Sequence, residues 1–257
     1  MPEQTEQHTV PADRPIIAFF DVDNTLLRGA SIYRMGRGAW QRGYLRLRDI
    51  LRFAWHQTRF VAVGENKKHM ISFRQRALHL ARGHSEAELT ELAREVYQRD
   101  IEPHLWPETV ELTQEHRSKG HQVWLVSATP VAMAEVIAGK LGLSGALGTV
   151  LESEGGRLTG EIVGELVHGE RKAEVARDLA ERLGAELADC WAYSDSSNDL
   201  PLLSLVGNRV VVNPDKALLR HAREHGWDVM RLDPASIRAA RRRVRREART
   251  AQRNAAR

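Results

Sequence analysis

Cysteine and long apolar runs are both scarce in this sequence, and each scarcity excludes a class of protein. The single cysteine, Cys190, excludes a disulfide framework and a zinc site built on cysteines. No stretch approaches the roughly 18 consecutive apolar residues needed to cross a bilayer. The N-terminal residues are polar and contain no apolar segment typical of a signal peptide. We therefore expect a cytoplasmic protein in a reducing compartment, with Cys190 as a buried core thiol.

Acidic residues are scarce at the C-terminal end, although the chain as a whole is nearly balanced. The sequence has 38 Lys and Arg against 34 Asp and Glu, a formal charge of +4. Residues 236–257 hold nine arginines and one glutamate, which leaves a net negative charge on the rest of the chain. The basic character therefore belongs to a tail whose arginines recur at helical spacing, at Arg238, Arg241, Arg242, Arg245, Arg246 and Arg249.

Two interpretations of this tail stay open. A run of like charge is often only a solvated segment that aids solubility. Alternatively, residues 236–257 could bind anionic lipid headgroups, as a peripheral membrane contact, or RNA. Apolar residues are few in this segment (Ile237 and Val244), so insertion into lipid is unfavourable.

Near the other end of the chain, two aspartates follow an apolar run. Residues 16–20 are all apolar, which predicts a strand buried on both faces, as in the middle of a parallel sheet. Asp21 and Asp23 come directly after it, at the strand end where ligands bind in open α/β sheets. Such a pair can be a nucleophile with its acid/base partner, a metal site, or both. The alternative is a turn in which an aspartate caps the strand.

Three later points carry further candidate chemistry. Ser127 ends a predicted strand just before a helix, where a hydroxyl and free backbone N–H groups favour an anion. Lys172 lies in the first turn of a predicted helix and neutralises phosphate if it points into a site. Asp195 and Asp199 form a second acidic pair after a strand, and two such pairs suit Mg²⁺. The eleven histidines are scattered singly, so none is assigned a metal.

Most of the chain alternates between strand and helix patterns, which predicts a parallel sheet with crossover helices. An all-helical insert interrupts the pattern from residue 31, and Ser85 with Glu88 predicts a capping box there. Thr129 is expected to cap a helix whose first residue is Pro130. The predicted helices cover 109–119, 170–183 and 216–224, the strands 121–127, 189–193 and 209–212, and a β-hairpin 150–163.

In order and spacing, these residues resemble the four motifs of the haloacid dehalogenase (HAD) superfamily. The matching residues are Asp21–Thr25, Ser127, Lys172 and Ser194–Asp199. The helical insert is similar to the cap of the phosphoserine-phosphatase-like branch, subfamily IB. The resemblance implies an α/β Rossmann-like core, a parallel sheet flanked by helices, with a helical cap inserted after the first strand. The expected division is a disordered leader (1–14), core (15–30 and 106–232), cap (31–105) and basic tail (233–257).

The resemblance also implies a Mg²⁺-dependent phosphomonoester hydrolase. Asp21 would attack phosphorus and form an aspartyl-phosphate, and Asp23 would protonate the leaving alcohol and then activate water. The implied ligands of Mg²⁺ are Asp21, the carbonyl of Asp23, Asp195 and, through water or Lys172, Asp199. The implied contacts to the phosphate and substrate are Ser127, Ala128, Lys172, Asn198 and the loosely aligned cap residue Arg76.

The substrate class implied by the resemblance is a small phosphorylated metabolite, phosphoserine or a related ester. Ala30 stands where phosphoserine phosphatases carry an acidic residue that binds the substrate amine. Ser196 and Ser197 also replace expected small glycine-type residues. A sugar phosphomutase of the same fold keeps every motif and is the alternative. A receiver domain lacks the second acidic pair and the insert. The sequence leaves the physiological substrate and the oligomeric state open.

Overall fold

The architecture is that of a computed structural model, which describes residues 14–44 and 81–255. The predicted leader, apart from Arg14, and the cap residue Arg76 lie outside the described residues. So does the middle of the predicted cap, residues 45–80.

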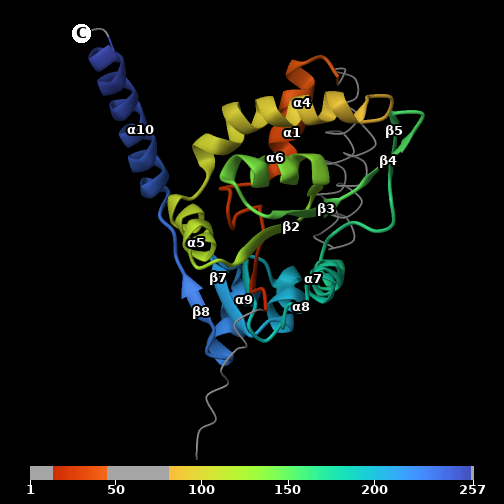
Figure 1. Cartoon of the computed structure of the whole chain (residues 1–257), viewed down its shortest axis with the longest axis vertical. Helices are drawn as coiled ribbons and strands as arrows, with labels where there is room; N and C mark the ends of the chain where they lie inside the picture. The colour runs from red at the N-terminus through yellow and green to blue at the C-terminus, as the bar shows by residue number, and fades with distance from the viewer. Residues whose placement is uncertain (1–13, 45–80, 256–257) are drawn as a thin grey trace, which may run out of the picture.

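A six-stranded sheet forms the centre of the molecule (Figure 1). Every neighbouring pair of its strands is parallel, as the alternating pattern predicts. The apolar run after residue 15 becomes a central strand that is completely buried. The order of the strands is β3 (Gly145–Thr149), β2 (Gln122–Pro130), β1 (Ile17–Phe20), β6 (Trp191–Ser194), β7 (Asn208–Val212) and β8 (Asp228–Met230).

Helices cover both faces of the sheet, and β1 contributes alternate side chains to each. Ala18 and Phe20 belong to one apolar cluster, and Ile17 and Phe19 belong to the other. The first cluster includes α6 (Val131–Leu141) and part of α5 (Pro107–Ser118). The second includes α7 (Glu170–Leu183), α8 (Leu200–Leu205) and α9 (Lys216–Glu224). Cys190 is buried in this second cluster, as expected.

The described elements between residues 31 and 105 are helical, in agreement with the predicted insert. They are α1 (Ser31–Gln41), α4 (Glu86–Val96), the π-helical turn η1 (Tyr97–Ile101) and the short η2 (Glu102–His104). The predicted capping box is confirmed, because Ser85 and Glu88 exchange side-chain and backbone hydrogen bonds. The division of the chain into core and cap remains a prediction.

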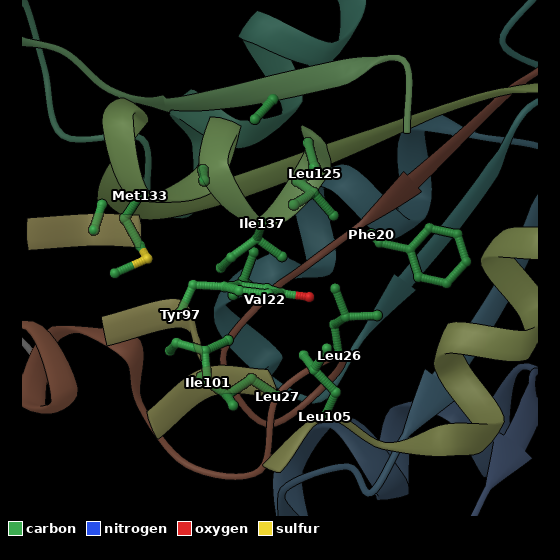
Figure 2. Close-up of a cluster of buried hydrophobic side chains, with 14 of the residues drawn as sticks. Phe20, Val22, Leu26, Leu27, Tyr97, Ile101, Leu105, Leu125, Met133 and Ile137 are labelled. Atoms are coloured by element: carbon green, nitrogen blue, oxygen red, sulfur yellow. The ribbon is translucent and has the colours of Figure 1, made fainter. Parts of the chain in front are cut away.

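One apolar cluster joins these helices to the sheet. Figure 2 shows Leu125 of β2 and Ile137 of α6 in the middle of this cluster, with Met133 of α6 on one side of them and Phe20 of β1 on the other. Tyr97 and Ile101 of η1 meet them from the other side, with Leu26, Leu27 and Leu105 beside them. The described insert is therefore packed onto the sheet through shared buried side chains.

A β-hairpin extends from the edge of the fold and contacts the start of α4. Its strands are β4 (Leu151–Glu154) and β5 (Arg157–Ile162), as the pattern over 150–163 predicts. Gly155 and Gly156 form the turn with positive φ angles of 57° and 77°, which glycine adopts without strain. Gly83 donates its N–H to Leu158 O at 2.8 Å.

The prediction that Thr129 caps a helix is wrong. The strand β2 runs on to Pro130, and α6 begins at Val131 without a side-chain cap. The pairing of β2 with β3 shifts register between Val126 and Pro130, which bends the chain there. The hydroxyl of Thr129 instead hydrogen-bonds two other side chains. The strands β3 and β8 were also not predicted, because one is glycine-rich and the other has three residues.

The basic tail forms the helix α10 (Pro234–Ala255), which confirms the helical spacing of its arginines. Figure 1 shows α10 extending away from the body of the molecule, with its start near α5. Ile237 is buried at this start, and Val244 is exposed. Contact of α10 with an anionic membrane or RNA remains a prediction. No helix in the described part of the chain has the length and apolar character to cross a membrane.

Close backbone packing at Gly207 leads to a prediction on stability. A Cβ atom added there would lie 1.7 Å from Ala188 O, between the segments that lead into β6 and β7. We expect Gly207→Ala to lower the free energy of unfolding by about 3 kcal/mol, measured by urea denaturation, because backbone must move. In the matched control Gly139→Ala, in α6, a Cβ meets nothing within 4 Å. That control should be neutral or slightly stabilising. Equal stability of the two variants would contradict the close approach.

Candidate active site

Three strands end at one edge of the sheet and carry most of the predicted site residues. In the register of β1, Phe20 lies beside Leu125 of β2 and Tyr193 of β6. Asp21 follows β1 directly and donates its backbone N–H to Tyr193 O at 2.9 Å. Because the strands are parallel, Ser127, near the end of β2, and Asp195, directly after β6, lie on either side of the chain at Asp21. This edge is where ligands bind in α/β sheets.

Lys172 ties two aspartates together in the interior. Its Nζ lies 2.5 Å from Asp21 Oδ1 and 2.7 Å from Asp199 Oδ2, and all three side chains are buried. The lysine lies in the first turn of α7, and its N–H donates to Gly169 O. Gly169 has a φ of 59°, which glycine adopts readily and which turns the chain into the helix. The side chain thereby reaches the end of β1, 151 positions earlier in the chain.

The second acidic pair divides into two environments. Asp199 Oδ2 also accepts a hydrogen bond from Ser194 Oγ at 2.6 Å, so it is held by a cation and a hydroxyl. Asp195 is half-buried on the loop between β6 and the short helix η3 (Ser197–Asp199). Asn198 is also half-buried, and its side chain donates to Ser196 Oγ at 3.1 Å.

Asp23 is held by the start of the helical insert. Its Oδ1 accepts the backbone N–H of Ser31, the first residue of α1, at 2.8 Å. The helix N-terminus favours this carboxylate through the free N–H groups and the helix dipole. Asn24, next in the chain, has a φ of 62°, and its side chain accepts the N–H of Gly29. These bonds close the loop between β1 and α1 around Asp23.

Three buried hydroxyls link Ser127 to the same helix start. Ser127 Oγ donates to Thr129 Oγ1 at 3.0 Å and accepts the N–H of Thr129. Thr129 Oγ1 also lies 2.5 Å from Ser31 Oγ. Ala128, between them, is half-buried. Thr129 and Ser31 were missed at the level of sequence, because their side chains meet only across 98 positions of chain.

The site buries more negative than positive charge, and the ionisation of its groups reflects this. Burial raises the pKa of Asp21 to about 6 despite the attraction of Lys172, and repulsion from Asp199 and Asp23 adds to the rise. Burial raises the pKa of Asp195 to about 8, with repulsion from Asp21 and Asp199 adding to it. Burial opposes the charge of Lys172, but attraction to Asp21 and Asp199 outweighs it and raises the lysine pKa.

The predicted site residues fall into two groups. Asp21, Lys172 and Asp199 form one ion-paired group, and Asp195 interacts electrostatically with all three. Asp23 and Ser127 are joined through the helix start at Ser31. Chemically, this is a carboxylate presented beside a cation, with the carboxylate of Asp195 close to both.

Comparison with known proteins shows the family to which a chain with these residues belongs. A model of the haloacid dehalogenase-like hydrolases matches residues 18–204, which include all four motifs. The chain belongs to this family. It is 49% identical, over 85% of its length and 71% of the relative's, to phosphoserine phosphatase SerB1 of Mycobacterium tuberculosis. It is 33% identical, over 83% of its length and 97% of the relative's, to a histidinol-phosphatase of Neisseria meningitidis.

A solved structure supports the fold. A Bordetella pertussis protein of unknown function superimposes with a TM-score of 0.74 at 28% identity, covering 84% of this chain and 98% of the other. The predicted HAD family and α/β fold are confirmed. The predicted class of enzyme, a phosphatase, is supported by the same comparisons. Assignment to subfamily IB remains a prediction.

The hydroxyl of Thr129 gives a prediction on turnover in this HAD enzyme. Thr129→Val keeps the shape but removes the hydroxyl that orients Ser127 and bonds Ser31. We expect kcat for the release of phosphate from p-nitrophenyl phosphate to fall about three- to tenfold. A loss of this size corresponds to the net contribution of about one hydrogen bond.

The control for this experiment is Thr129→Ser, which keeps the hydroxyl and should retain most of the activity. Unchanged kcat in Thr129→Val would show that the hydroxyl does not orient Ser127. Thermal unfolding of both variants separates a loss of stability from a loss of orientation.

Proposed function

We propose that this HAD enzyme is a Mg²⁺-dependent phosphomonoesterase that acts on a small phosphorylated metabolite. The observation that carries the proposal is the ion pair of Asp21 with Lys172 at the end of β1. It presents a carboxylate nucleophile beside a cation that can balance phosphoryl charge. Phosphoryl transfer depends mainly on such positioning and charge balance.

In the first step, an oxygen of Asp21 bonds to phosphorus while the bond from phosphorus to the ester oxygen breaks. The leaving alkoxide takes a proton from Asp23, so that an alcohol departs and Asp21 carries the phosphoryl group. The hydrogen bond from Ser31 to Asp23 fixes the carboxyl group that gives this proton.

In the second step, Asp23 takes a proton from water, and the water oxygen bonds to phosphorus. The bond between phosphorus and Asp21 then breaks, which releases inorganic phosphate and restores both carboxyl groups. Lys172 stays within reach of Asp21 throughout and contacts the phosphoryl oxygens. We assign Ser127, the backbone at Ala128 and Asn198 to the same oxygens. Ser127 and Ala128 lie near the end of β2, beside β1, and Asn198 lies in η3, shortly after β6. Arg76 is outside the described residues, and its role in binding substrate remains a prediction.

The residues present fit a divalent cation. Asp21 and Asp195 are carboxyl groups close to one another whose pKa values are raised by burial and by repulsion from neighbouring carboxylates, and hard carboxylate oxygens are the ligands that Mg²⁺ takes. Asp21, the carbonyl of Asp23 and Asp195 would hold the ion. Asp199 would support the set through its bond to Lys172. Bound there, Mg²⁺ supplies positive charge that stabilises the phosphoryl oxygens.

The comparisons and the site support the type of reaction more specifically than the identity of the substrate. Relatives bear names for two different substrates, phosphoserine and histidinol phosphate. At Ala30, the residue before α1, this chain has no carboxylate to bind the amine of phosphoserine. We therefore extend the proposal to small phosphomonoesters and leave a phosphomutase of the same fold as the alternative.

One experiment tests the reaction and ranks the substrates. Phosphate release is measured from a panel of amino-acid, histidinol, sugar, nucleotide and lipid-headgroup phosphates, with Mg²⁺ or with EDTA. We expect Mg²⁺-dependent release that Asp21→Asn lowers at least about a thousandfold, because the amide cannot attack phosphorus.

The matched control for Asp21→Asn is Asp178→Asn, an exposed carboxylate on α7, which should turn over normally. Release by Asp21→Asn at the wild-type rate would exclude the aspartyl-phosphate route. Isomerisation of a sugar phosphate without release of phosphate would favour the phosphomutase.

Binding of Mg²⁺ should depend on pH. The metal requires ionised carboxylates, whereas the pKa values of Asp21 and Asp195 in the metal-free protein are about 6 and about 8. Protons therefore compete with the metal at low pH. We expect the Kd for Mg²⁺, measured by calorimetry, to fall as pH rises from 6 to 8, with release of protons.

Asp195→Asn provides the comparison, because an amide has no proton to lose in this range. It should bind Mg²⁺ weakly and with a flatter dependence on pH. A wild-type Kd that is constant from pH 6 to 8 would contradict the metal role of these carboxylates.

A further inference from the structure

A second group of side chains that could bind a metal lies at the C-terminal end of α9. It is separate in the sequence from the carboxylates of the active site. His221, Glu224 and His225 each offer one ligand atom, and these atoms all lie within 4.8 Å of one another. The expectation that histidines form no ligand group is therefore wrong. Spacings of three and four residues place side chains on one face once the segment is a helix.

We propose that His221, Glu224 and His225 bind a divalent d-block cation of the Zn²⁺ type. Two imidazole nitrogens and a carboxylate oxygen are a ligand set that suits such ions, with water completing the coordination. The set suits Mg²⁺ poorly, since Mg²⁺ prefers oxygen ligands alone. The site thus differs in ion class from the active site, and it does not depend on the proposed phosphatase reaction.

The hydrogen bonding of His225 leaves one nitrogen available for a metal. Its Nδ1 lies 2.8 Å from the backbone carbonyl oxygen of His221, which can only accept, so Nδ1 carries the proton. The neutral ring then presents the lone pair of Nε2. A backbone carbonyl that fixes the tautomer in this way is a usual outer partner of a metal-binding histidine.

The rings of His221 and His225 are stacked on one another. The centroids of His221 and His225 are 4.0 Å apart, and the planes differ by 23°. Trp227 contacts His221 edge-on, at 4.8 Å between centroids, and so limits the movement of that ring.

The end of the helix adds a favourable field. These residues form the last turn of α9, which ends at Glu224, with His225 as its C-terminal cap. Unpaired carbonyl groups give that end of a helix a partial negative charge, which favours a cation. Glu224 adds a full charge, while Arg223 projects to the opposite face by its position in the helix. Glu224 and His225 are exposed, so an ion has access from solvent.

The start of the same helix is bound to the loop of the second acidic pair. Asp215 caps α9 through its bond from Leu218, accepts the N–H of Ser197, and donates its own N–H to Asp195 O. A cation at the far end would hold the last turn of a helix that supports this loop. We therefore expect occupancy to stabilise the protein while leaving the active-site carboxylates in place.

The test is Zn²⁺ binding to the full chain, freed of metal and then held in excess Mg²⁺ so that the carboxylate site is filled. Calorimetry should find one further Zn²⁺ per chain. His221→Gln and His225→Gln should each weaken it by more than about tenfold, since even outer partners of a metal are worth that much. Arg223→Gln, in the same turn, should bind Zn²⁺ as the wild type does.

The urea midpoint of unfolding is a second measurement, which separates loss of the Zn²⁺ site from misfolding of the variants. Without Zn²⁺, the exposed variant His225→Gln should unfold at the wild-type urea midpoint, and Zn²⁺ should raise the midpoint of the wild type and Arg223→Gln only. Wild-type Zn²⁺ affinity in His221→Gln and His225→Gln would overturn the proposal. So would the absence of any Zn²⁺ binding beyond the Mg²⁺-filled site.

Discussion

The site depends on the buried ion pairs of one ammonium group, that of Lys172. Lys172 is the partner of both Asp21 and Asp199, and the three side chains are almost completely removed from water. Burying an unpaired charge is very costly, whereas a paired and hydrogen-bonded one is tolerated. The lysine therefore makes it feasible to place several carboxylates at one strand end. It neutralises only part of their charge, and the remainder is what a dication can bind.

The parallel sheet supplies the rest of the geometry. Parallel strands end at the same edge, so residues far apart in sequence converge there without any contact of their own to draw them together. Asp21 and Asp195 directly follow β1 and β6, Ser127 lies near the end of β2, and the order of the strands makes these residues neighbours. The backbone N–H of Ser31, at the start of α1, then donates a hydrogen bond to Asp23 and holds its carboxylate in place.

Sequence reasoning predicted the parts of this arrangement that repeat a local pattern. The apolar run before Asp21, the capping box at Ser85 and the helix over 170–183 follow from composition and spacing alone. The resemblance to the family motifs predicted that the remote aspartates lie in one site. A local pattern could not reveal that Thr129 bonds Ser31, because the partners meet only after folding. The histidine pair on α9 was overlooked although the helix over 216–224 was predicted, because His225 lies just beyond the predicted end of that helix.

The apolar cluster beneath α4 has a consequence for how such an enzyme can diversify. Residues of the described insert, Tyr97 and Ile101 among them, complete the same buried cluster as Phe20 of β1 and Ile137 of α6. Removing or exchanging that segment as a module would open the core of the sheet to water. The described insert therefore shares its core with the sheet, and its buried residues cannot be exchanged independently of the sheet.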